Sequence, residues 1–536
     1  MRKRICVIVP VYNALNELKA CVKSLLKKLD FSLAEVMIAD DFSQEETRDY
    51  IKSVAAKYPD KFRAEMGEEK KNRGYLLNCN DAVLKTDAEI VVLLNSDCEI
   101  SDNFAENILK CFDSDPNIIA ASPIASNSAS YYIPQFLPLP LMNFFLNKNL
   151  PQYPEVFNAE GFCFCVRKSY IDEYGLFDPV YGKGYCEEVD FCLRAKSNGK
   201  KCVLIDNLYV KHKRNKSFGT DKNKYLSINN KIMFSRWGEM FSIKAEQRRV
   251  NPIKDITKKS FGIFSFIPRK IIKFNKRNFS NRVKTITRYF KFKQPVNKNA
   301  KSIIYTCISG DCDIIPIIQT YYSPDRRYIC FTDNRTLINM KYFGMWEIRP
   351  LAFNELDGTR NARWHKTHPH ILFPDCNESI WIDANIDILT PYLFEEIREK
   401  DQPLLVPLHQ CRKSVYSECK VVKCLKKDQD DIVDKTVDYI REKGMPENYG
   451  LNETNIIYRK HNVDKIKTLM DDWWEMIAKF SKRDQLSFSY VLWKNNIRVE
   501  DISIDNARID PLNFRIYSHK LTNTIIGKFL SLIFHK

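Results

Sequence analysis

Apolar and polar positions alternate along the first part of the chain in a way that predicts strands separated by helices. Residues 4–12 form a nearly continuous apolar run, and residues 16–28 repeat apolar side chains at helical spacing. The pattern continues with an expected strand at 34–41, a helix at 44–58 and a strand at 88–97. This alternation favours a mostly parallel sheet covered by helices. We therefore predict a Rossmann-like α/β domain over residues 1–220.

A second α/β pattern begins at residue 301. Expected strands cover 301–310, 327–334 and 378–389, and expected helices include residues 463–480 and one that begins at "RDQLSF". We predict a second domain over residues 301–515, a basic and partly helical linker over 221–300, and a C-terminal amphipathic tail over 516–536.

The linker carries much of the excess positive charge. The chain has a formal net charge of +17, and Asp255 is the only acidic residue between Asn251 and Lys301, where Lys and Arg alternate with Phe and Ile. Three interpretations remain open: a solvated linker, a segment lying on an anionic membrane surface, and a nucleic-acid-binding arm. No recognised nucleic-acid module accompanies the segment, so the third is the weakest and we expect no nucleic-acid partner.

The composition places the protein in a reducing compartment. Its 17 Cys are scattered through apolar runs with no C-x-x-C spacing, which favours buried thiols over disulfides or a thiolate zinc site. The N-terminal "MRKRICVIVPVYN" is interpreted as a first strand, not a signal peptide. No apolar run is long enough to predict a membrane-spanning helix. We expect a cytoplasmic protein, and peripheral contact with the inner face of the membrane follows if the linker lies on anionic lipid.

Acidic and amide side chains follow the strands of the first domain. Asp40 and Asp41 end one expected strand, and Asn95 and Asp97 end another. Ligands of such sheets bind beyond the carboxyl ends of the strands, so these groups are expected at one edge. Asp97 is a candidate ligand for a divalent cation. A single Asp after a strand is more often a cap, and only the joint pattern favours a site.

A cluster of acids and one histidine complete this candidate site. "CEEVDFCLR" places Glu187, Glu188 and Asp190 at the start of a helix, where crowding of like charges raises one pKa and creates a candidate general base. His212 follows an apolar strand, in position to reach a metal ion or a phosphate. A structural role is the alternative for each of these residues.

The second domain repeats this organisation with other residues. "SIWIDANIDIL" ends in Asp383, Asn385 and Asp387, which share one face if the strand continues. In the basic run "TRNARWHKTHPH" we expect Arg363 and Lys366 to contact phosphate, with structural and metal-binding roles as alternatives. Asp484 and Gln485, at the start of "RDQLSF", are either helix caps or hydrogen-bond partners for sugar hydroxyls.

Six segments of the first domain together resemble family 2 glycosyltransferases of the GT-A fold, in the branch similar to rhamnosyltransferases. They are "VIVPVYNA", "IADDFSQEET", "NRGYLLNCNDAV", "VLLNSDCEI", "GFCFCVRKSYIDEYGLFDPVYGKGYCEEVDFCLRAKSNGKK" and "YVKHKRNKSFG". The resemblance implies that Pro10, Tyr12, Asn13, Asp40, Asp41, Arg73, Gly74, Asn95 and Ser96 line the nucleotide-sugar pocket. It also implies that Asp97 is the metal-binding carboxylate of a DxD motif, that His212 helps to hold the metal or diphosphate, and that Glu188 is the general base with Asp190 as its rival.

The second domain resembles a glycosyltransferase-like family known as domain of unknown function 616. The resemblance rests on "YTCISGDCD", "CFTDN", "SIWIDANI", "GLNETNIIYR" and "RDQLSF". It implies a second GT-A-like nucleotide-sugar site in which Asp383 and Asn385 replace the DxD pair. Asn is a neutral and weaker ligand than a carboxylate, so fold is better supported here than activity.

Together these observations predict a bifunctional glycosyltransferase of bacterial capsule or lipopolysaccharide synthesis. We expect a nucleotide-sugar donor, Mn²⁺ or Mg²⁺ as cofactor, inversion at the first site, and a glycan or lipid-linked glycan as acceptor. One alternative keeps only the first domain active and makes the second a glycan-binding or scaffold module. Alternatives from other classes are a nucleotidyltransferase, which lacks its Gly-rich loop in "VPVYNALNE", and a nucleic-acid-binding protein.

Overall fold

The computed structural model describes residues 3–67, 71–213, 221–238, 240, 252–262, 292, 297, 299–310 and 315–517. The chain divides into two compact units, Met1–Met233 with Gln247–Asn275 and Phe234–Glu246 with Lys276–Lys536. Each unit contains one large sheet with helices packed against it, so the expected α/β class is confirmed for both.

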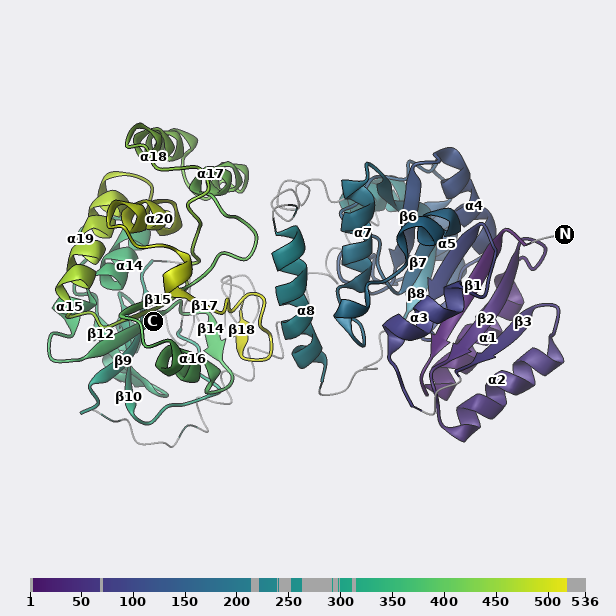
Figure 1. Ribbon diagram of the computed structural model, residues 1–536, viewed down its shortest axis with the longest axis horizontal. Coiled ribbons are helices and arrows are strands. Elements are labelled where there is room, and N and C mark those ends of the chain that lie inside the picture. Colours follow the sequence, from purple (N-terminus) through teal and green to yellow (C-terminus); the bar gives the residue numbers. More distant parts are fainter. Residues whose placement is uncertain are drawn as a thin grey trace. The chain divides into compact units, whose positions relative to one another are not determined.

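The first unit is built on an eight-stranded sheet in the order β3-β2-β1-β4-β7-β6-β8-β5 (Figure 1). Its strands are β1 (Ile5–Val11), β2 (Ala34–Asp40), β3 (Phe62–Met66), β4 (Ile90–Leu94), β5 (Cys98–Glu99), β6 (Ile118–Ala125), β7 (Cys163–Arg167) and β8 (Lys201–His212). Strands β3, β2, β1 and β4 are parallel, and β7 runs antiparallel to both of its neighbours.

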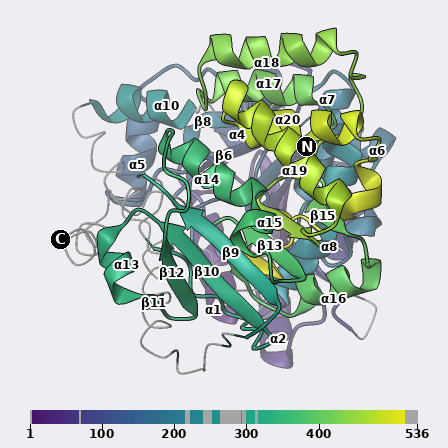
Figure 2. The ribbon, with the colours of Figure 1, turned by 90° about the vertical axis from the view of Figure 1, so that its left-hand side faces the viewer.

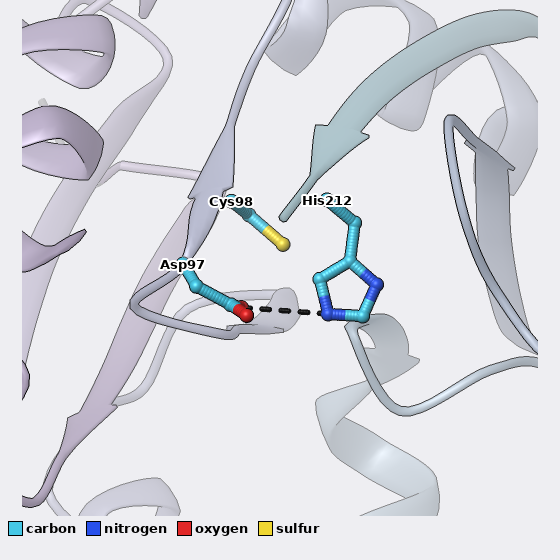
Figure 3. Close-up of side chains that lie close together, drawn as sticks. All are labelled: Asp97, Cys98 and His212. Atoms are coloured by element: carbon cyan, nitrogen blue, oxygen red, sulfur yellow. Dashed lines mark ion pairs between the residues drawn. The ribbon is translucent and has the colours of Figure 1, made fainter. Parts of the chain in front are cut away.

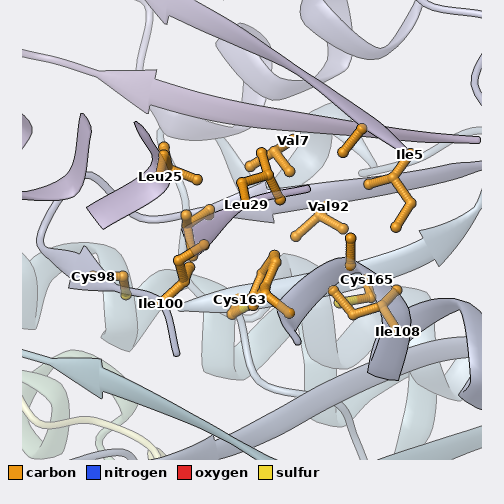
Figure 4. Packing of buried hydrophobic residues seen from close by; sticks show 14 of the residues in the cluster. Ile5, Val7, Leu25, Leu29, Val92, Cys98, Ile100, Ile108, Cys163 and Cys165 are labelled. Carbon is orange, nitrogen blue, oxygen red and sulfur yellow. The ribbon is translucent and has the colours of Figure 1, made fainter. Parts of the chain in front are cut away.

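Helices cover both faces of this sheet. The helices of this unit are α1 (Leu15–Lys28), α2 (Glu45–Lys57), α3 (Tyr75–Val83), α4 (Phe104–Ser114), α5 (Leu139–Leu146), α6 (Lys168–Tyr174), α7 (Glu187–Ser197) and α10 (Pro252–Phe261), and α8 (Lys222–Trp237) begins in this unit. Figure 4 shows one face, where apolar side chains of β1, β4 and β7 pack with those of α1 and α4. Because side chains alternate along a strand, Phe164 of β7 points to the other face and packs against Phe191 of α7.

The second unit has its own eight-stranded sheet, in the order β11-β12-β10-β9-β13-β16-β15-β17. Its strands are β9 (Ser302–Ile308), β10 (Arg326–Thr332), β11 (Tyr342–Phe343), β12 (Trp346–Pro350), β13 (Glu378–Ile382), β15 (Leu404–Pro407), β16 (Ile456–Arg459) and β17 (Ser503–Ile504). Figure 2 shows β12, β10 and β9 side by side, and all three are parallel. A separate pair is formed by β14 (Ile386–Ile388) and β18 (Phe514–Ile516).

Eight helices of the described part of this unit surround the second sheet. They are α13 (Arg335–Met340), α14 (Gly358–Thr367), α15 (Pro369–Leu372), α16 (Tyr392–Lys400), α17 (Val415–Cys424), α18 (Asp430–Glu442), α19 (Asp464–Lys479) and α20 (Asp484–Lys494). The predicted helices at 463–480 and from "RDQLSF" are α19 and α20.

The two sheets share one topology. In chain order, β9, β10, β12, β13, β15, β16 and β17 occupy the places that β1, β2, β3, β4, β6, β7 and β8 occupy in the first unit. Strand β16 is antiparallel to both of its neighbours, as β7 is. By this correspondence α20, which precedes β17, is the counterpart of α7, which precedes β8.

The predicted single strand at 378–389 is wrong. A turn separates β13 from β14, because the backbone N–H of Ile386 donates to the carbonyl of Asp383, 3.0 Å away. Asp383, Asn385 and Asp387 therefore do not alternate along one extended strand, and their side chains have different surroundings.

Of the expected basic linker, α8 and α10 lie within the described residues, whereas residues 263–291 lie outside them. The C-terminal tail from residue 518 onward also lies outside them, so its expected amphipathic character stays a prediction. Among the helices that the structure describes, none combines the length and apolar character needed to cross a bilayer.

Candidate functional site

The end of β4 forms a tight turn at the edge of the first sheet. The backbone N–H of Asn95 donates to the carbonyl of Phe162, 2.9 Å away, and the N–H of Cys98 donates back to the carbonyl of Asn95 at 3.0 Å. Asn95, Ser96 and Asp97 are all partly exposed in this turn. The short strand β5 then pairs Cys98 with His212 at the end of β8, which brings two distant parts of the chain together.

Asp97 and His212, which the sequence predicts as metal ligands, lie close enough together for one ion to contact both. Oδ1 of Asp97 lies 3.4 Å from Nε2 of His212, and both side chains are 11% exposed (Figure 3). Nδ1 of His212 lies 2.8 Å from the carbonyl oxygen of Asn127, so this nitrogen must be the donor. That tautomer leaves a lone pair on Nε2, as is usual for metal-bound histidines.

A divalent cation fits these donors. A carboxylate oxygen and an imidazole nitrogen suit Mn²⁺, and Mg²⁺ is served by the carboxylate with water and phosphate completing its shell. The ring of Phe162 stacks on His212 with centroids 5.2 Å apart and an angle of 18°, which fixes the ring plane. Sγ of Cys98 lies within 4.8 Å of these donor atoms, but Cys98 is a fully buried member of the apolar core. Its soft sulfur is the wrong ligand for these hard cations.

The candidate base lies beside the same turn. The carboxylate of Glu188, at the start of α7, lies over Gly161, because a Cβ placed there would be 3.6 Å from its Oε1. Phe162, the next residue, stacks on His212. The candidate metal ligand and the candidate base therefore contact adjacent residues, Phe162 and Gly161. Glu188 is partly exposed, whereas the neighbouring Glu187 is buried.

The adjacent carboxyl groups of Glu187 and Glu188 differ in burial, and burial affects the pKa of Glu187. Burial, and secondarily the charge of Glu188, raises the pKa of Glu187 well above its usual value. One oxygen of Glu187 has no hydrogen-bond partner among the described residues, as expected for a protonated acid in an apolar site. Burial, more than the crowding that the sequence predicts, therefore raises the pKa of Glu187, and Glu188 is the partly exposed acid of the two.

Asp190 has the geometry of a structural residue. Its carboxylate is buried and accepts a hydrogen bond of 2.8 Å from the hydroxyl of Tyr181, and Arg194 lies 3.8 Å away. These contacts favour Glu188 over Asp190 as the base.

The loop before α7 is held by a residue that the sequence did not single out. The side-chain amide of Asn229, on α8, donates to the carbonyl oxygens of Tyr181, Gly184 and Tyr185 at 2.8–2.9 Å. Tyr185 and Cys186 have positive φ, a conformation that needs support from surrounding structure. An isolated Asn on a helix gives no signal in sequence, because its meaning depends on which loop it reaches.

On the nucleotide side, both predicted acids are buried and already hydrogen-bonded. Asp41 accepts from the backbone N–H of Arg73 and Gly74 at 2.9 and 2.8 Å, and from the Asn72 amide. Asp40 accepts from the backbone of Ser43. In this structure the two acids shape the loops around the expected pocket.

The remaining predicted residues of this pocket differ in how accessible they are. Pro10 is buried within β1, whereas Tyr12, just beyond the strand, is 52% exposed and Asn13 is half-buried. The guanidinium of Arg73 pairs with Asp81 at 2.5 Å. Tyr12 is therefore the residue of this group with most surface to offer a nucleoside.

The second unit repeats the strand-end turn of the first, but its Asp and Asn residues stand in the opposite order. The N–H of Asp383 donates to the carbonyl of Asn455 at 2.9 Å, as Asn95 does to Phe162. Asp383 thus takes the place of Asn95, and Asn385 the place of Asp97. The amide nitrogen of Asn385 donates to the carbonyl of Tyr517 at 2.7 Å, and Oδ1 of Asp383 accepts from the indole of Trp381 at 3.0 Å.

These residues fit a cation less well than those of the first unit. Asp387, considered as a third ligand, is buried and accepts from the backbone and hydroxyl of Thr320 at 2.7 and 3.0 Å. Within the described residues, no His, Cys, Asp and Glu cluster of metal-binding size other than the one at Asp97 is found. Metal binding at Asp383 and Asn385 stays a prediction that this geometry does not favour.

Lys366 and Asp484 form a buried ion pair. The ammonium of Lys366, only 1% exposed, contacts Asp484 at 2.5 Å, and Arg363 lies 3.3 Å from the same oxygen. Burial lowers the pKa of Lys366 to about 8. Burial alone would raise the pKa of Asp484, but the charges of Arg363 and Lys366 lower it instead. The pair is therefore charged at neutral pH.

This arrangement corrects two expectations. Lys366 is enclosed with its counter-ion, so it presents no open surface to a phosphate in this structure. Asp484 is not a cap, because Arg483 occupies the N-cap position without a side-chain cap bond. By the shared topology, Asp484 and Gln485 stand where Glu187 and Glu188 stand in the first unit. Gln485 donates to the carbonyl of Asn452 at 3.1 Å.

Sequence reasoning also missed a charged group close to Asp383. Arg508 lies beyond the end of β17, and its Nε is 2.6 Å from Glu453. Burial opposes the charged form of Arg508, but the carboxylates of Glu453 and Asp383 raise its pKa. Its position after a strand end in "SIDNARID" was the available signal.

Comparison with known proteins finds a family match for a segment of each unit. Residues 6–175 match the family model "Glycosyl transferase family 2", and residues 296–505 match "TOD1/MUCI70, glycosyltransferase-like domain". A curated relative, the "Probable hexosyltransferase MUCI70" of Arabidopsis thaliana, is 27% identical over 172 residues. That match covers 29% of this chain and 29% of the relative, so the chain spans less than a third of the relative's length.

Solved structures show weaker likeness. A structure titled GalNAc-T7 with UDP, GalNAc and Mn²⁺ has a TM-score of 0.37 and 16% identity, covering 46% of this chain and 51% of that one. The mannosyltransferase PcManGT from Pyrobaculum calidifontis, with GDP-Man and Mn²⁺, has a TM-score of 0.33 and 15% identity, covering 50% and 72%. Scores this low support no argument about the present site.

The expected resemblances are thus upheld at the level of glycosyltransferase domains, and the second matching family is described by TOD1/MUCI70. Both sheets agree with the expected GT-A-like architecture. The chain carries a family 2 glycosyltransferase domain in its N-terminal unit and a TOD1/MUCI70 glycosyltransferase-like domain in its C-terminal unit.

Proposed function

We propose that this protein is a glycosyltransferase of the hexosyltransferase type whose N-terminal unit is metal-dependent and inverting. The observation that carries the proposal is the meeting of Asp97, His212 and Glu188 around the Gly161–Phe162 backbone at the edge of the first sheet. Both family matches agree with sugar transfer as the reaction class.

The residues of the first unit account for each requirement of this reaction. Asp97 and His212 would hold Mn²⁺ or Mg²⁺, which supplies positive charge to the departing nucleoside diphosphate. Glu188 accepts the proton of the acceptor hydroxyl as that oxygen attacks the anomeric carbon. Glu187 remains protonated beside it, so one negative charge, not two, faces the attacking oxygen. Attack from the side opposite the leaving group inverts the anomeric configuration.

For the second unit we propose its own nucleotide-sugar site, which makes the protein bifunctional. The shared sheet order and the repeated strand-end turn support this assignment. The proposed acceptor is a glycan, free or on a lipid carrier, in bacterial capsule or lipopolysaccharide synthesis. Such an acceptor suits a chain with a net charge of +17 that works at the inner face of a membrane.

A second candidate keeps a single active site and makes the C-terminal unit a glycan-binding or scaffold module. The observation that favours it is the buried pair of Lys366 and Asp484, which occupies the position where the first unit has its acids. A carboxylate clamped by two cations is a poor proton acceptor.

A panel of nucleotide sugars tests the proposal, with nucleoside diphosphate release measured in the presence of Mn²⁺ or Mg²⁺. Asp97→Ala and Glu188→Gln are expected to lower release at the first site by about a hundredfold or more. Asp49→Ala, which removes an exposed acid on α2, is the matched control and should leave release unchanged.

Asp383→Ala decides between the two candidates. Loss of a second donor activity in this variant supports bifunctionality, and unchanged release with every donor supports the single-site candidate. Release that survives Asp97→Ala and Glu188→Gln with the preferred donor of the first unit would overturn the main proposal.

A further inference from the structure

Helix α5 is apolar on nearly all sides, burying Met142 and Leu146 while leaving two other apolar side chains exposed. Its sequence, LPLMNFFL, contains a single polar residue, Asn143, and this side chain is buried. The Asn143 amide donates to the carbonyl of Asp102 at 2.9 Å, and its oxygen accepts from the N–H of Tyr209 at 3.2 Å. The apolar residues Leu141 and Phe144 instead point outward, 45% and 57% exposed.

A soluble surface helix normally hides its apolar stripe and shows its polar one. Four residues beyond the end of the helix, Leu150 is also exposed, at 86%. We call Leu141, Phe144 and Leu150 the α5 patch. Leu141 and Phe144 are one helical turn apart and share a face of α5, and exposed apolar patches mark contact with a partner or a membrane.

Basic residues lie next to the α5 patch. Nζ of Lys148 is 5.0 Å from the ring centre of Phe144 and 4.5 Å from that of Phe145. Helix α10 lies beside α5 (Figure 2). The ring centroids of Phe261 and Phe145 are 5.6 Å apart. Lys258 and Lys259 are exposed on α10.

A hydrogen bond places Lys258 and Lys259 at the end of α10 that lies near the C-terminus of α5. The amide nitrogen of Asn149 donates to the hydroxyl of Ser260 at 3.2 Å, and Ser260 directly follows Lys259. Apolar side chains between flanking lysines match a membrane interface, where rings enter the headgroup region and ammonium groups meet anionic lipid.

We propose that the α5 patch, with Lys148, Lys258 and Lys259, is a docking surface for an anionic membrane. The positive charge of these three lysines favours anionic lipid as the partner. A second copy of this chain is disfavoured, because its own lysines would lie against them. The segment that leads into α5 carries Asn127, and the carbonyl oxygen of Asn127 accepts a hydrogen bond from Nδ1 of His212. This segment therefore connects the proposed docking surface to the candidate metal site. The proposal does not depend on which sugar is transferred.

Vesicle flotation of the full chain tests this surface, with vesicles of phosphatidylcholine alone or mixed with phosphatidylglycerol. The wild type is expected to float with the anionic vesicles and to be released by salt. Leu141→Ser with Phe144→Ser should weaken binding by roughly tenfold or more, because two apolar side chains no longer leave water. Lys148→Glu with Lys258→Glu and Lys259→Glu should abolish the preference for anionic lipid.

Leu84→Ser with Ile371→Ser is the matched control, since both side chains are exposed and lie outside the α5 patch. Unchanged melting temperatures establish that the variants fold, as expected for exposed positions. The proposal is overturned if the Leu141 and Phe144 variant floats like the wild type, which would place attachment elsewhere in the chain. It is equally overturned if the wild type does not float but forms a dimer that this variant dissolves.

Discussion

At the scale of single residues, the first site depends on which atom of His212 carries the proton. The carbonyl of Asn127 requires a donor at Nδ1, so Nε2 is the atom available to a cation. Asp97 provides the only charged oxygen of the predicted motif, because Asn95 takes its first position. Loss of Asp97 and loss of His212 should therefore affect metal binding and activity differently.

We predict that His212→Gln raises the Mn²⁺ concentration needed for half-maximal nucleotide release by about ten- to a hundredfold, leaving residual activity at saturating metal. Asp97→Ala should lose activity at any metal concentration, because the anionic ligand is gone. Mn²⁺ titrations of release, and of bound metal by electron paramagnetic resonance, measure both effects. Cys98→Ser serves as the control and should leave the Mn²⁺ requirement unchanged. An Mn²⁺ requirement that moves with Cys98 and not with His212 would contradict the assignment.

The Lys366 and Asp484 pair makes a second residue-scale prediction. Lys366→Met removes the closest cation from buried Asp484 and leaves it Arg363 and the hydroxyl of Thr454, so the second unit should lose about 3–5 kcal/mol of unfolding free energy. Lys366→Met combined with Asp484→Leu removes both charges and should recover most of that loss. Urea denaturation of the three proteins checks the pattern, and equal losses in the single and double variants would argue against an ion pair.

At the scale of secondary-structure elements, helix α8 acts on the site through the loop before α7. Asn229 ties three carbonyls of residues 181–185 to α8. That loop leads into α7, whose first turn carries Glu188. An element outside the sheet therefore positions a residue at its edge.

We predict that Asn229→Ala destabilises the first unit by about 1–3 kcal/mol, because buried carbonyls lose their donor. It should also lower kcat while leaving the Mn²⁺ requirement unaltered, since Asp97 and His212 stand on other elements. Thermal unfolding and steady-state kinetics report the two effects, and Lys224→Ala, an exposed change on the same helix, is the control. An unaltered kcat despite the loss of stability would show that α8 does not position the site.

At the scale of the whole molecule, stability should depend on pH through Glu187. Burial raises the pKa of this carboxyl, so the folded state holds a proton that the unfolded state releases above about pH 4.5. Protonated Glu187 therefore stabilises the fold at low pH, and this contribution declines as pH rises through the window above 4.5. Glu187→Gln, which needs no proton, should escape this decline.

The expected result is a difference in melting temperature that favours Glu187→Gln and grows as pH increases from 5 to 8. Calorimetry across this range measures it. Asp49→Asn, at an exposed position, is the control and should show no such trend. A difference that shrinks with increasing pH would mean that the folded state holds Glu187 ionised.

Many helices and strands could also be predicted from the sequence. Helix α1 buries Leu18, Cys21, Val22 and Leu25 as its spacing predicts, because helical periodicity is local and needs no distant partner. Strand ends were recognised in the same way, which placed Asp97 and Asp383 at sheet edges. The turn after β13 was missed, since "DANIDIL" alternates like a strand and only the bond from Ile386 to Asp383 breaks it.

What the sequence determined by itself was the order of elements and the chemistry available at their ends, because backbone preference and amphipathic spacing act over a few residues. The tertiary structure decided which of these groups meet. It joined Asp97 to His212 through β5 and β8, placed Glu188 over Gly161, and enclosed Asp484 with Lys366. It also left Leu141 and Phe144 of α5 exposed. Contacts between distant segments follow from packing of the whole chain, which no local pattern encodes.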